Sequence, residues 1–210
     1  MPAGLFLSIE GIDGSGKSTQ LQLLTAKLGQ LGISYLLNRE PGGSEVGRQI
    51  RQILLRPGNP VSPTAELLLY FANRAQNVDE QIRPALAAGS LVISDRYTDS
   101  TLAYQGAARA LGQALVRQLH EIACRGTEPS LTLYLRIRPE VSAERLRRQA
   151  KDRLESEGTD FHRAVFGAYE ELAAAYPQRI VAVDGERDPG VIAAEIWTIV
   201  SDRLGKDGAA

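Results

Sequence analysis

The segment Gly11–Ser18, which reads Gly-Ile-Asp-Gly-Ser-Gly-Lys-Ser, constrains this chain more than any other. It fits the pattern of a phosphate-binding loop, in which two glycines separated by four residues precede lysine and then serine or threonine. An apolar run over 5–9 precedes the loop, and a helix is expected from Lys17 to Leu31. The loop thus lies between a strand and a helix, as this motif requires, and the alternative of a plain glycine turn with an exposed lysine is disfavoured.

Each residue type in this loop has a physical task. The glycines let the backbone turn tightly, so that its N–H groups approach the β- and γ-phosphates of a nucleoside triphosphate. We expect Lys17 to reach the β- and γ-phosphate oxygens and the Ser18 hydroxyl to bind Mg²⁺. The predicted triphosphate site consists of Gly11, Ile12, Asp13, Gly14, Ser15, Gly16, Lys17, Ser18 and Thr19.

Short apolar runs alternate with longer amphipathic segments along the whole chain. The strands expected are 5–9, 33–37, 91–94, 131–137 and 180–183. The helices expected are 17–31, 45–55, 63–88, 100–108, 111–122, one from Pro139, 160–175 and 191–204. Such alternation predicts right-handed crossovers and a parallel sheet covered on both faces, which is an α/β fold. Since no linker or repeat divides the chain, we expect one domain over 1–204 and a flexible tail over 205–210.

The overall charge and the cysteine content exclude several classes of protein. A formal net charge of −1 argues against a general binder of nucleic acids or anionic membranes. The one cysteine, Cys124, rules out an internal disulfide and is typical of a reducing compartment. We find no signal-peptide pattern at Met1–Leu7 and no apolar run near the ~20 residues that a membrane span needs. We therefore expect a cytoplasmic protein without nucleic-acid or membrane partners.

Charged side chains follow the third expected strand, in the segment Asp95-Arg96-Tyr97. Because the loops at the carboxyl edge of a parallel sheet converge on the ligand crevice, this segment is expected to face the phosphates. Asp95 is then a candidate for holding Mg²⁺, and Arg96 for bridging the transferred phosphoryl group and its acceptor. A structural Asp–Arg ion pair at a strand end is the alternative.

The second expected strand is followed by Arg39-Glu40-Pro41-Gly42-Gly43. Proline and two glycines fix a rigid turn, which sets the angle at which Arg39 faces the crevice. Arg51 lies on the next expected helix. Taken alone, either arginine is better explained as a solvated surface charge.

Two further segments carry candidate ligand-binding side chains. Tyr70 and Arg74 are four residues apart on an expected helix and share one face, where an aromatic plane beside a guanidinium suits a nucleobase. A core tyrosine with an arginine extending past it to solvent explains the pair equally well. Arg147, Arg148 and Arg153 flank a charged, aperiodic stretch that is expected to close over phosphates as a lid. An ordinary charged helix face is favoured for Arg147 and Arg148 individually.

Together these segments resemble the thymidylate kinases, in the bacterial-type branch of the P-loop nucleoside monophosphate kinases. The most specific segment is Asp99–Gly106, which reads Asp-Ser-Thr-Leu-Ala-Tyr-Gln-Gly, and the resemblance covers nearly the whole chain. It implies a three-layer α/β/α P-loop NTPase fold with a five-stranded parallel sheet and a short arginine-bearing lid over about 147–159. It also implies a homodimer that uses ATP and Mg²⁺ to phosphorylate thymidine monophosphate to thymidine diphosphate, for dTTP synthesis.

The resemblance also implies roles for individual residues. The implied monophosphate site consists of Asp13, Arg39, Arg51, Tyr70, Arg74, Arg96, Thr101, Tyr104 and Gln105. In it Asp13 binds the sugar 3′-hydroxyl, and Arg39, Arg51 and Arg96 hold the phosphate. Arg74 addresses thymine O4, Thr101 and Gln105 line the base edge, and Tyr104 closes against the sugar. Tyr70 takes the stacking position, where phenylalanine is common in the family, although Phe71 adjoins it.

The catalytic residues implied are Lys17, Arg96 and Arg153, with Ser18 and Asp95 at the metal. Gly14 stands where one branch of the family has an arginine in the phosphate loop. The catalytic arginine is therefore expected in the lid, where Arg153 matches it best. A phosphate acceptor is largely anionic at neutral pH, with a pKa of about 6, so no general base is needed. His120 and His162 match none of these motifs and are interpreted as structural.

Three other functions stay open from the sequence. A kinase for another monophosphate or for a deoxynucleoside is the nearest, and a deoxynucleoside would need a carboxylate base, for which Glu40 is a poor candidate. A GTPase would require an Asn-Lys-x-Asp guanine reader, which the sequence lacks. A catalytically silent nucleotide-binding regulator is opposed by the intact Lys17, Ser18, Asp95 and Arg96.

Overall fold

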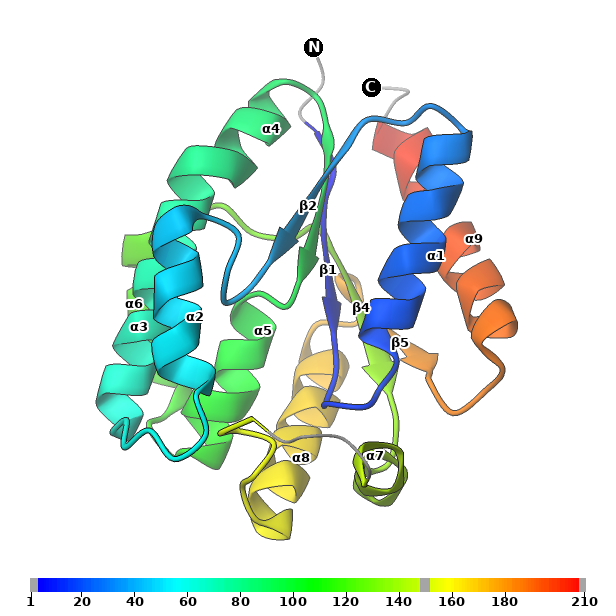
Figure 1. The fold of residues 1–210 in the computed structure, drawn as a ribbon. Coiled ribbons are helices and arrows are strands. Elements are labelled where there is room, and N and C mark those ends of the chain that lie inside the picture. The colour runs from blue at the N-terminus through cyan, green and yellow to red at the C-terminus, as the bar shows by residue number, and fades with distance from the viewer. Residues whose placement is uncertain (1–3, 148–151, 208–210) are drawn as a thin grey trace.

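The computed structural model describes residues 4–147 and 152–207, and a five-stranded sheet forms its centre (Figure 1). Neighbouring strands all pair in parallel, in the order β2-β3-β1-β4-β5. The strands are β1 (Phe6–Glu10), β2 (Tyr35–Arg39), β3 (Leu91–Asp95), β4 (Leu131–Arg136) and β5 (Ile180–Asp184). The predicted strands and parallel sheet are thus confirmed, with boundaries that differ by one or two residues.

Helices cover both faces of this sheet and complete the three layers. One face is covered by α1 (Lys17–Gln30) and α9 (Pro189–Asp207), whose apolar side chains form one core with β1, β3 and β4. The opposite core joins the sheet to α2 (Glu45–Leu55), α3 (Pro63–Asn77), α6 (Gln113–Cys124) and α8 (Thr159–Ala175). Each fully buried leucine or isoleucine contributes about 1.5–3 kcal/mol, so these two cores hold the layers together.

The carboxyl ends of all five strands meet at one edge of the sheet. The strands β2 and β3 lie on one side of β1, and β4 and β5, which come later in the chain, lie on the other. Such a switch point opens a crevice beyond the strand ends. The segment Gly11–Ser18 leaves β1 at this position, with the end of β3 on one side and the end of β4 on the other.

Two predicted helices are divided in the structure. The stretch expected over 63–88 consists of α3, a π-helical segment η1 (Val78–Ile82) and α4 (Arg83–Ala87). Pro84 has no backbone N–H and cannot continue an α-helical ladder there. The stretch expected over 100–108 consists of α5 (Thr98–Thr101) and a second π-helical segment, η2 (Leu102–Ala108). Such π-helical segments occur frequently at functional sites.

The segment after α7 (Pro139–Leu146) includes residues 148–151, so Arg148 and part of the predicted lid lie outside the described residues. The described part of the lid, 152–158, consists mostly of turns. Helix α9 continues to Asp207, so residues 205–207, which were expected in the tail, are helical. Residues 208–210 are not described. Within 4–147 and 152–207, no helix is both long and apolar enough to cross a membrane.

Candidate functional site

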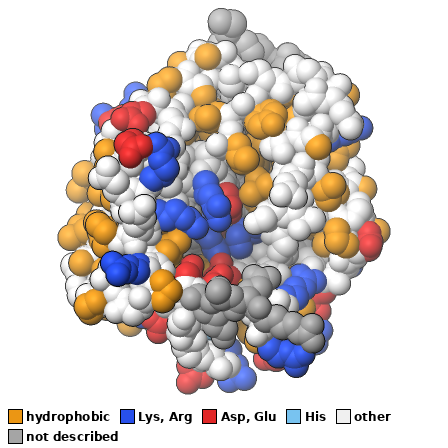
Figure 2. All heavy atoms as spheres, in the orientation of Figure 1, with side chains coloured by type: hydrophobic (Ala, Val, Ile, Leu, Met, Phe, Trp, Pro, Cys, Tyr) orange, Lys and Arg blue, Asp and Glu red, His pale blue; other side chains and the backbone are white. Residues whose placement is uncertain are grey.

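A cavity of about 680 Å³ opens at the carboxyl edge of the sheet. Its walls come from the loops after β1, β2, β3 and β5, together with side chains of α2, α3 and η2. Figure 2 shows basic side chains gathered in the hollow on this face, and those that line the cavity include Lys17, Arg39, Arg51, Arg74 and Arg96. A volume of this size is sufficient for nucleotide-sized ligands, and the basic lining favours anions.

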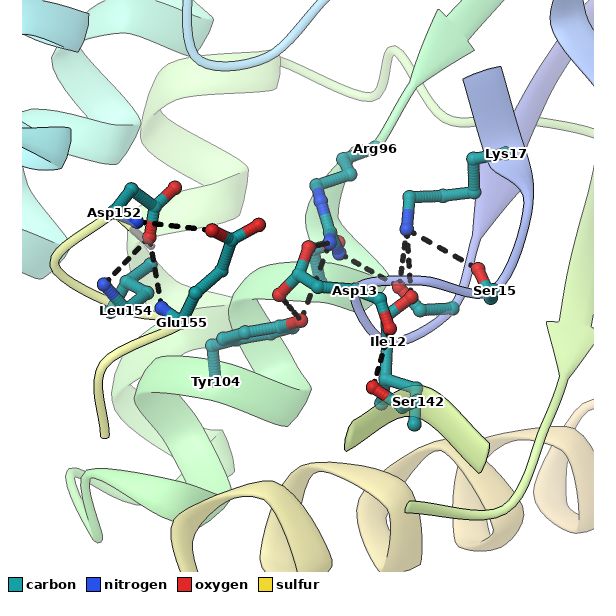
Figure 3. Close-up of polar contacts among 12 residues, drawn as sticks. Ile12, Asp13, Ser15, Lys17, Arg96, Tyr104, Ser142, Asp152, Leu154 and Glu155 are labelled. Carbon is teal, nitrogen blue, oxygen red and sulfur yellow. Dashed lines mark hydrogen bonds and ion pairs between the residues drawn. The ribbon is translucent and has the colours of Figure 1, made fainter. Parts of the chain in front are cut away.

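The loop after β1 wraps one end of the cavity. Gly14 and Gly16 have φ values of 75° and 95°, which non-glycine residues rarely adopt. The Lys17 side chain folds back over the loop, and its Nζ donates to the carbonyl oxygens of Gly11 and Ile12 at 2.9 and 3.0 Å (Figure 3). Burial, together with the charge of Arg96, lowers the Lys17 pKa to about 8. An anion bound beside Lys17 would favour the charged ammonium form and raise this pKa again.

Arg96 directly follows β3, beside the phosphate loop, and has a φ of 71°, in the left-handed region. Its guanidinium donates to the Gly11 carbonyl at 3.0 Å and to Asp13 Oδ1 at 2.5 Å (Figure 3). Burial alone would raise the Asp13 pKa, but the charges of Arg96 and Lys17 outweigh it and lower that pKa. Such a strained backbone persists only where the surroundings fix it, and strained residues concentrate at functional sites.

Glu10, the last residue of β1, fixes the backbone at Arg96. It is fully buried, and its Oε1 accepts a hydrogen bond from the backbone N–H of Tyr97 at 2.6 Å. Its Oε2 accepts from Ser100 Oγ at 2.5 Å and from the Tyr169 hydroxyl at 2.9 Å. This role of Glu10 was not predicted from the sequence, although a carboxylate that ends an apolar strand just before a phosphate loop is a usable signal.

We expect a Glu10→Gln variant to lose part of the pH dependence of stability. Burial raises the Glu10 pKa to about 7, from 4.5. Between these values the folded protein holds a proton that the unfolded chain has released, so stability falls as pH rises through this window. From about pH 5 to about pH 8, urea unfolding should show wild-type stability falling more than the variant's, by on the order of 2 kcal/mol. Parallel stability curves for the two proteins would contradict this assignment.

Two more arginines face the cavity near the end of β2. Arg39 Nε lies 3.6 Å from Asp95 Oδ2, and Arg51 Nη1 donates to the Pro41 carbonyl at 2.8 Å. Burial and the nearby charge of Arg39 lower the Arg51 pKa. Two guanidinium groups that repel one another at the wall of a cavity are stabilised by an anion between them. The structure therefore brings Arg39, Arg51 and Arg96 to one cavity, as predicted.

The face of α3 that carries Tyr70 and Arg74 also borders the cavity. Arg74 is buried, donates from Nε to Glu40 Oε2 at 2.6 Å, and lies over the Phe71 ring at 5.1 Å. Tyr70 lines the cavity, whereas Phe71 lies behind Arg74. Of the two neighbouring aromatic side chains, Tyr70 is thus the one that faces the ligand space.

The helical segments α5 and η2 form another wall of the cavity. The Tyr104 hydroxyl donates to Asp13 Oδ2 at 3.0 Å. Thr101 and Gln105 are four residues apart on the same wall, and both line the cavity. Thr101 Oγ1 is buried and has no hydrogen-bond partner among the described residues. A buried hydroxyl without a partner is costly, so this atom points to a polar group on a ligand.

The structure does not place Arg153 at the phosphate end of the site. Its Nη2 donates to Glu66 Oε2 at 2.5 Å, and its Nε to the Leu54 carbonyl at 2.6 Å. Arg153 does not line the cavity, although its neighbours Leu154 and Glu155 do. The expected position is thus corrected: a buried carboxylate that was not predicted from the sequence holds the guanidinium. The Arg147 side chain is exposed and lies 3.5 Å from Glu144.

Beyond the phosphate loop, the cavity extends toward the loop after β5. Arg145 joins the two loops by donating to the Gly14 carbonyl and the Gly185 carbonyl, each at 3.0 Å. Arg145 was not predicted to be a site residue, because an arginine on an amphipathic helix carries no distinctive signal. Gly11 and Ile12 do not line the cavity themselves, whereas Asp13 to Thr19 all do.

The donor set suits Mg²⁺ if phosphate and water supply most ligands. Among the described residues, no three His, Cys, Asp or Glu side chains gather as a metal-binding group. Mg²⁺ in phosphoryl-transfer sites keeps several waters and needs one or two protein ligands besides the phosphates. Ser18 and Asp95 both line the cavity and offer the oxygen ligands that this ion prefers.

Comparisons with known proteins point to one family. The family model described as thymidylate kinase matches residues 9–196. A thymidylate kinase of Synechococcus sp. is 49% identical over 200 residues, which are 95% of this chain and 96% of the relative. The thymidylate kinase of Nostoc punctiforme is 48% identical, over 96% of this chain and 97% of the relative. That of Deinococcus radiodurans is 44% identical, over 97% of this chain and 99% of the relative.

Proposed function

Because the chain belongs to the thymidylate kinase family, we propose that it transfers the γ-phosphoryl group of ATP to thymidine monophosphate. The products are ADP and thymidine diphosphate. The observation that carries this proposal is that one cavity joins a phosphate loop to a wall suited to a nucleobase. Lys17 belongs to the phosphate loop. The wall suited to a nucleobase carries Tyr70, Thr101 and Gln105.

The acceptor nucleotide is proposed to bind between α3 and η2. Tyr70 stacks on the thymine ring, and Arg74 addresses O4 from its buried position beside Glu40. Arg39, Arg51 and Arg96 hold the 5′-phosphate. These assignments combine the family resemblance with the lining of the cavity.

The sugar is proposed to lie against Asp13 and Tyr104. Asp13 is a carboxylate and accepts hydrogen bonds, so a 3′-hydroxyl can donate to it. The Tyr104 hydroxyl already donates to Asp13, and the Tyr104 ring lies 5.1 Å from the Arg96 guanidinium carbon. Tyr104 thereby fills the space beside the sugar, and this packing would disfavour an added 2′-hydroxyl.

The chemical step is a displacement at phosphorus. An oxygen of the acceptor phosphate bonds to the γ-phosphorus, and the bond from that phosphorus to the β,γ-bridging oxygen breaks, so that ADP leaves. The acceptor is already anionic, with a pKa of about 6, and loses no proton to the protein. The main barrier is the repulsion between two polyanions. Lys17 and Arg96 reduce it by holding positive charge at the site of transfer.

We also propose Ser18 and Asp95 as the residues that hold Mg²⁺ with the phosphates of ATP. The ion, when bound, adds positive charge beside the β- and γ-phosphates. Asp95 lies at the end of β3 with its side chain 13% exposed and close to Arg39. It can therefore reach the phosphate end of the cavity.

Arg153 is proposed to contribute from the lid, and for this it must leave Glu66. We expect Arg153→Ala to lower turnover more than it weakens binding of thymidine monophosphate, because a lid arginine acts mainly on the transferring phosphoryl group. Steady-state kinetics and calorimetric titration of the monophosphate measure the two effects. Equal losses in turnover and affinity would instead assign Arg153 to structural anchoring of the lid. Arg147→Ala is the matched control, since Arg147 is exposed.

Assembly and compartment belong to the same proposal. Leu68 on α3 and Leu115 and Ile122 on α6 are apolar yet exposed, by 51%, 38% and 73%, and these two helices contact one another. We infer that two copies associate through this region as a homodimer, as in the family resemblance. Light scattering of the purified protein tests this. The cytoplasm is the compartment proposed.

The deciding experiment is a coupled assay with ATP, Mg²⁺ and a panel of acceptors. We expect thymidine monophosphate to be phosphorylated far faster than uridine, guanosine or adenosine monophosphates and than thymidine itself. The structure disfavours thymidine because Glu40, the candidate base for a hydroxyl acceptor, is buried against Arg74. Preferential turnover of another acceptor would refute the assignment. If no acceptor is phosphorylated, the alternative of a catalytically silent nucleotide-binding regulator would be favoured.

A further inference from the structure

Glu66 is a buried carboxylate behind the cavity wall that no part of the mechanism above uses. It lies on α3 one turn before Tyr70, and its side chain is 0% exposed. Its oxygens accept hydrogen bonds from Gln105 Nε2 at 2.7 Å, from Arg109 at 3.3 Å and from Arg153 Nη2 at 2.5 Å. Glu66 therefore contacts the cavity wall and the lid at the same time.

The contact with Glu66 determines which way the Gln105 amide points. A carboxylate only accepts hydrogen bonds, so the NH₂ group of Gln105 must turn toward it. The amide oxygen then remains as the polar atom of this side chain for the cavity, which Gln105 lines. A reversed amide would set the oxygen of Gln105 against a carboxylate oxygen and would leave that amide oxygen without a donor there.

This orientation has a consequence for base recognition. Thymine presents a hydrogen-bond donor at N3–H beside the acceptor O4, whereas cytosine presents an acceptor at N3 beside a donor at N4. An amide oxygen in the cavity accepts from N3–H and is mismatched with a bare N3. The nitrogen of a reversed amide would have the opposite preference.

We propose that Glu66 is a positioning residue for specificity, which holds Gln105 so that its oxygen selects a pyrimidine bearing N3–H. The inference rests on the proposed function, since it assigns the base to the wall formed by Thr101 and Gln105. Through Arg153, the same carboxylate links this base reader to the lid. Glu66 touches neither substrate nor reacting atoms, so its effect passes through Gln105.

The test compares two matched ligands in Glu66→Met. Thymidine monophosphate and 5-methyl-deoxycytidine monophosphate differ only at N3 and C4, and calorimetric titration gives the dissociation constant of each. We expect the preference for thymidine monophosphate to fall about tenfold in the variant, the value of one hydrogen bond to a charged group. Methionine is similar in length to glutamate and so fills the space of the Glu66 side chain. In this variant Arg109 keeps Glu157 as a partner, and Arg153 keeps the Leu54 carbonyl.

Two control variants separate positioning from general damage. Arg153→Leu removes the lid contact and leaves the bond from Gln105 to Glu66, so the ratio of the two dissociation constants should stay at the wild-type value. Glu66→Gln keeps an oxygen that can accept from Gln105 and should retain most of the preference. A wild-type ratio in Glu66→Met, or an equal fall in Arg153→Leu, would overturn the inference.

A second pair of variants applies if Glu66→Met does not fold. Gln105→Glu alone places two carboxylates against one another and should weaken binding of thymidine monophosphate at least tenfold. Adding Glu66→Gln supplies a donor again and should restore most of the affinity, whereas no restoration would refute the role of Glu66. Failure of the proposed function is distinguishable from these outcomes, because it would show as wild-type protein that does not phosphorylate thymidine monophosphate.

Discussion

Replacing Lys17 with methionine is expected to lower turnover by about two to three orders of magnitude, with a smaller loss of ATP affinity. The Lys17 ammonium is buried, and its donors now contact the Gly11 and Ile12 carbonyl oxygens. Charge that is held rigidly at a developing charge stabilises a transition state by several kcal/mol, and a single such donor is worth about 10²–10³ in rate. The coupled assay and a fluorescent-nucleotide titration give the two quantities. Near-normal turnover in the variant would exclude the proposed mechanism.

The protonation of Lys17 provides an independent measurement. Because its pKa is about 8 in the free protein, this lysine is mostly neutral near pH 9, and bound triphosphate should raise that pKa. ATP binding near pH 9 should therefore take up part of a proton, which calorimetry in buffers of different ionisation enthalpy detects. This uptake should vanish in Lys17→Met and persist in Lys27→Met, a control on the exposed side of the same helix.

Much of the fold and of the phosphate site could be predicted because the responsible patterns are local. The loop Gly11–Ser18 combines backbone requirements and side-chain chemistry in one continuous segment, so its position between β1 and α1 followed directly. Apolar runs marked each strand, since strands buried on both faces carry few polar residues. The residues Arg39, Asp95 and Arg96 could be placed because each ends or directly follows a parallel strand at the same edge.

What the sequence did not indicate depends on contacts between distant segments. Glu66 binds side chains 39 and 87 residues away in sequence, and no pattern near it shows that Arg153 will be one of them. Glu10 and Tyr169 are 159 residues apart and meet only because α8 packs against the carboxyl end of β1. The division of the 63–88 helix also escaped prediction, because an unbroken apolar periodicity does not distinguish α-helical from π-helical hydrogen bonding.

Substituting Arg96 should separate catalysis from backbone strain. We expect Arg96→Ala and Arg96→Gly each to lower turnover by about three orders of magnitude, because both remove the guanidinium that contacts Asp13 and the Gly11 carbonyl in the phosphate loop. Their stabilities should differ, since the φ of 71° at this position suits glycine and costs other residues about 1–2 kcal/mol. Thermal unfolding should therefore show Arg96→Gly to be more stable than Arg96→Ala.

The matched control for this pair is Arg125, which also has a positive φ, 48°, but lies exposed at the end of α6, away from the cavity. Arg125→Gly should be more stable than Arg125→Ala by a similar amount, while both keep wild-type turnover, because the exposed ion pair with Asp79 contributes little. Equal stability of the two Arg96 variants would mean that the network around Glu10 does not impose strain there. Normal turnover in either Arg96 variant would remove Arg96 from the mechanism, and phosphoryl transfer would then depend on Lys17 and the lid.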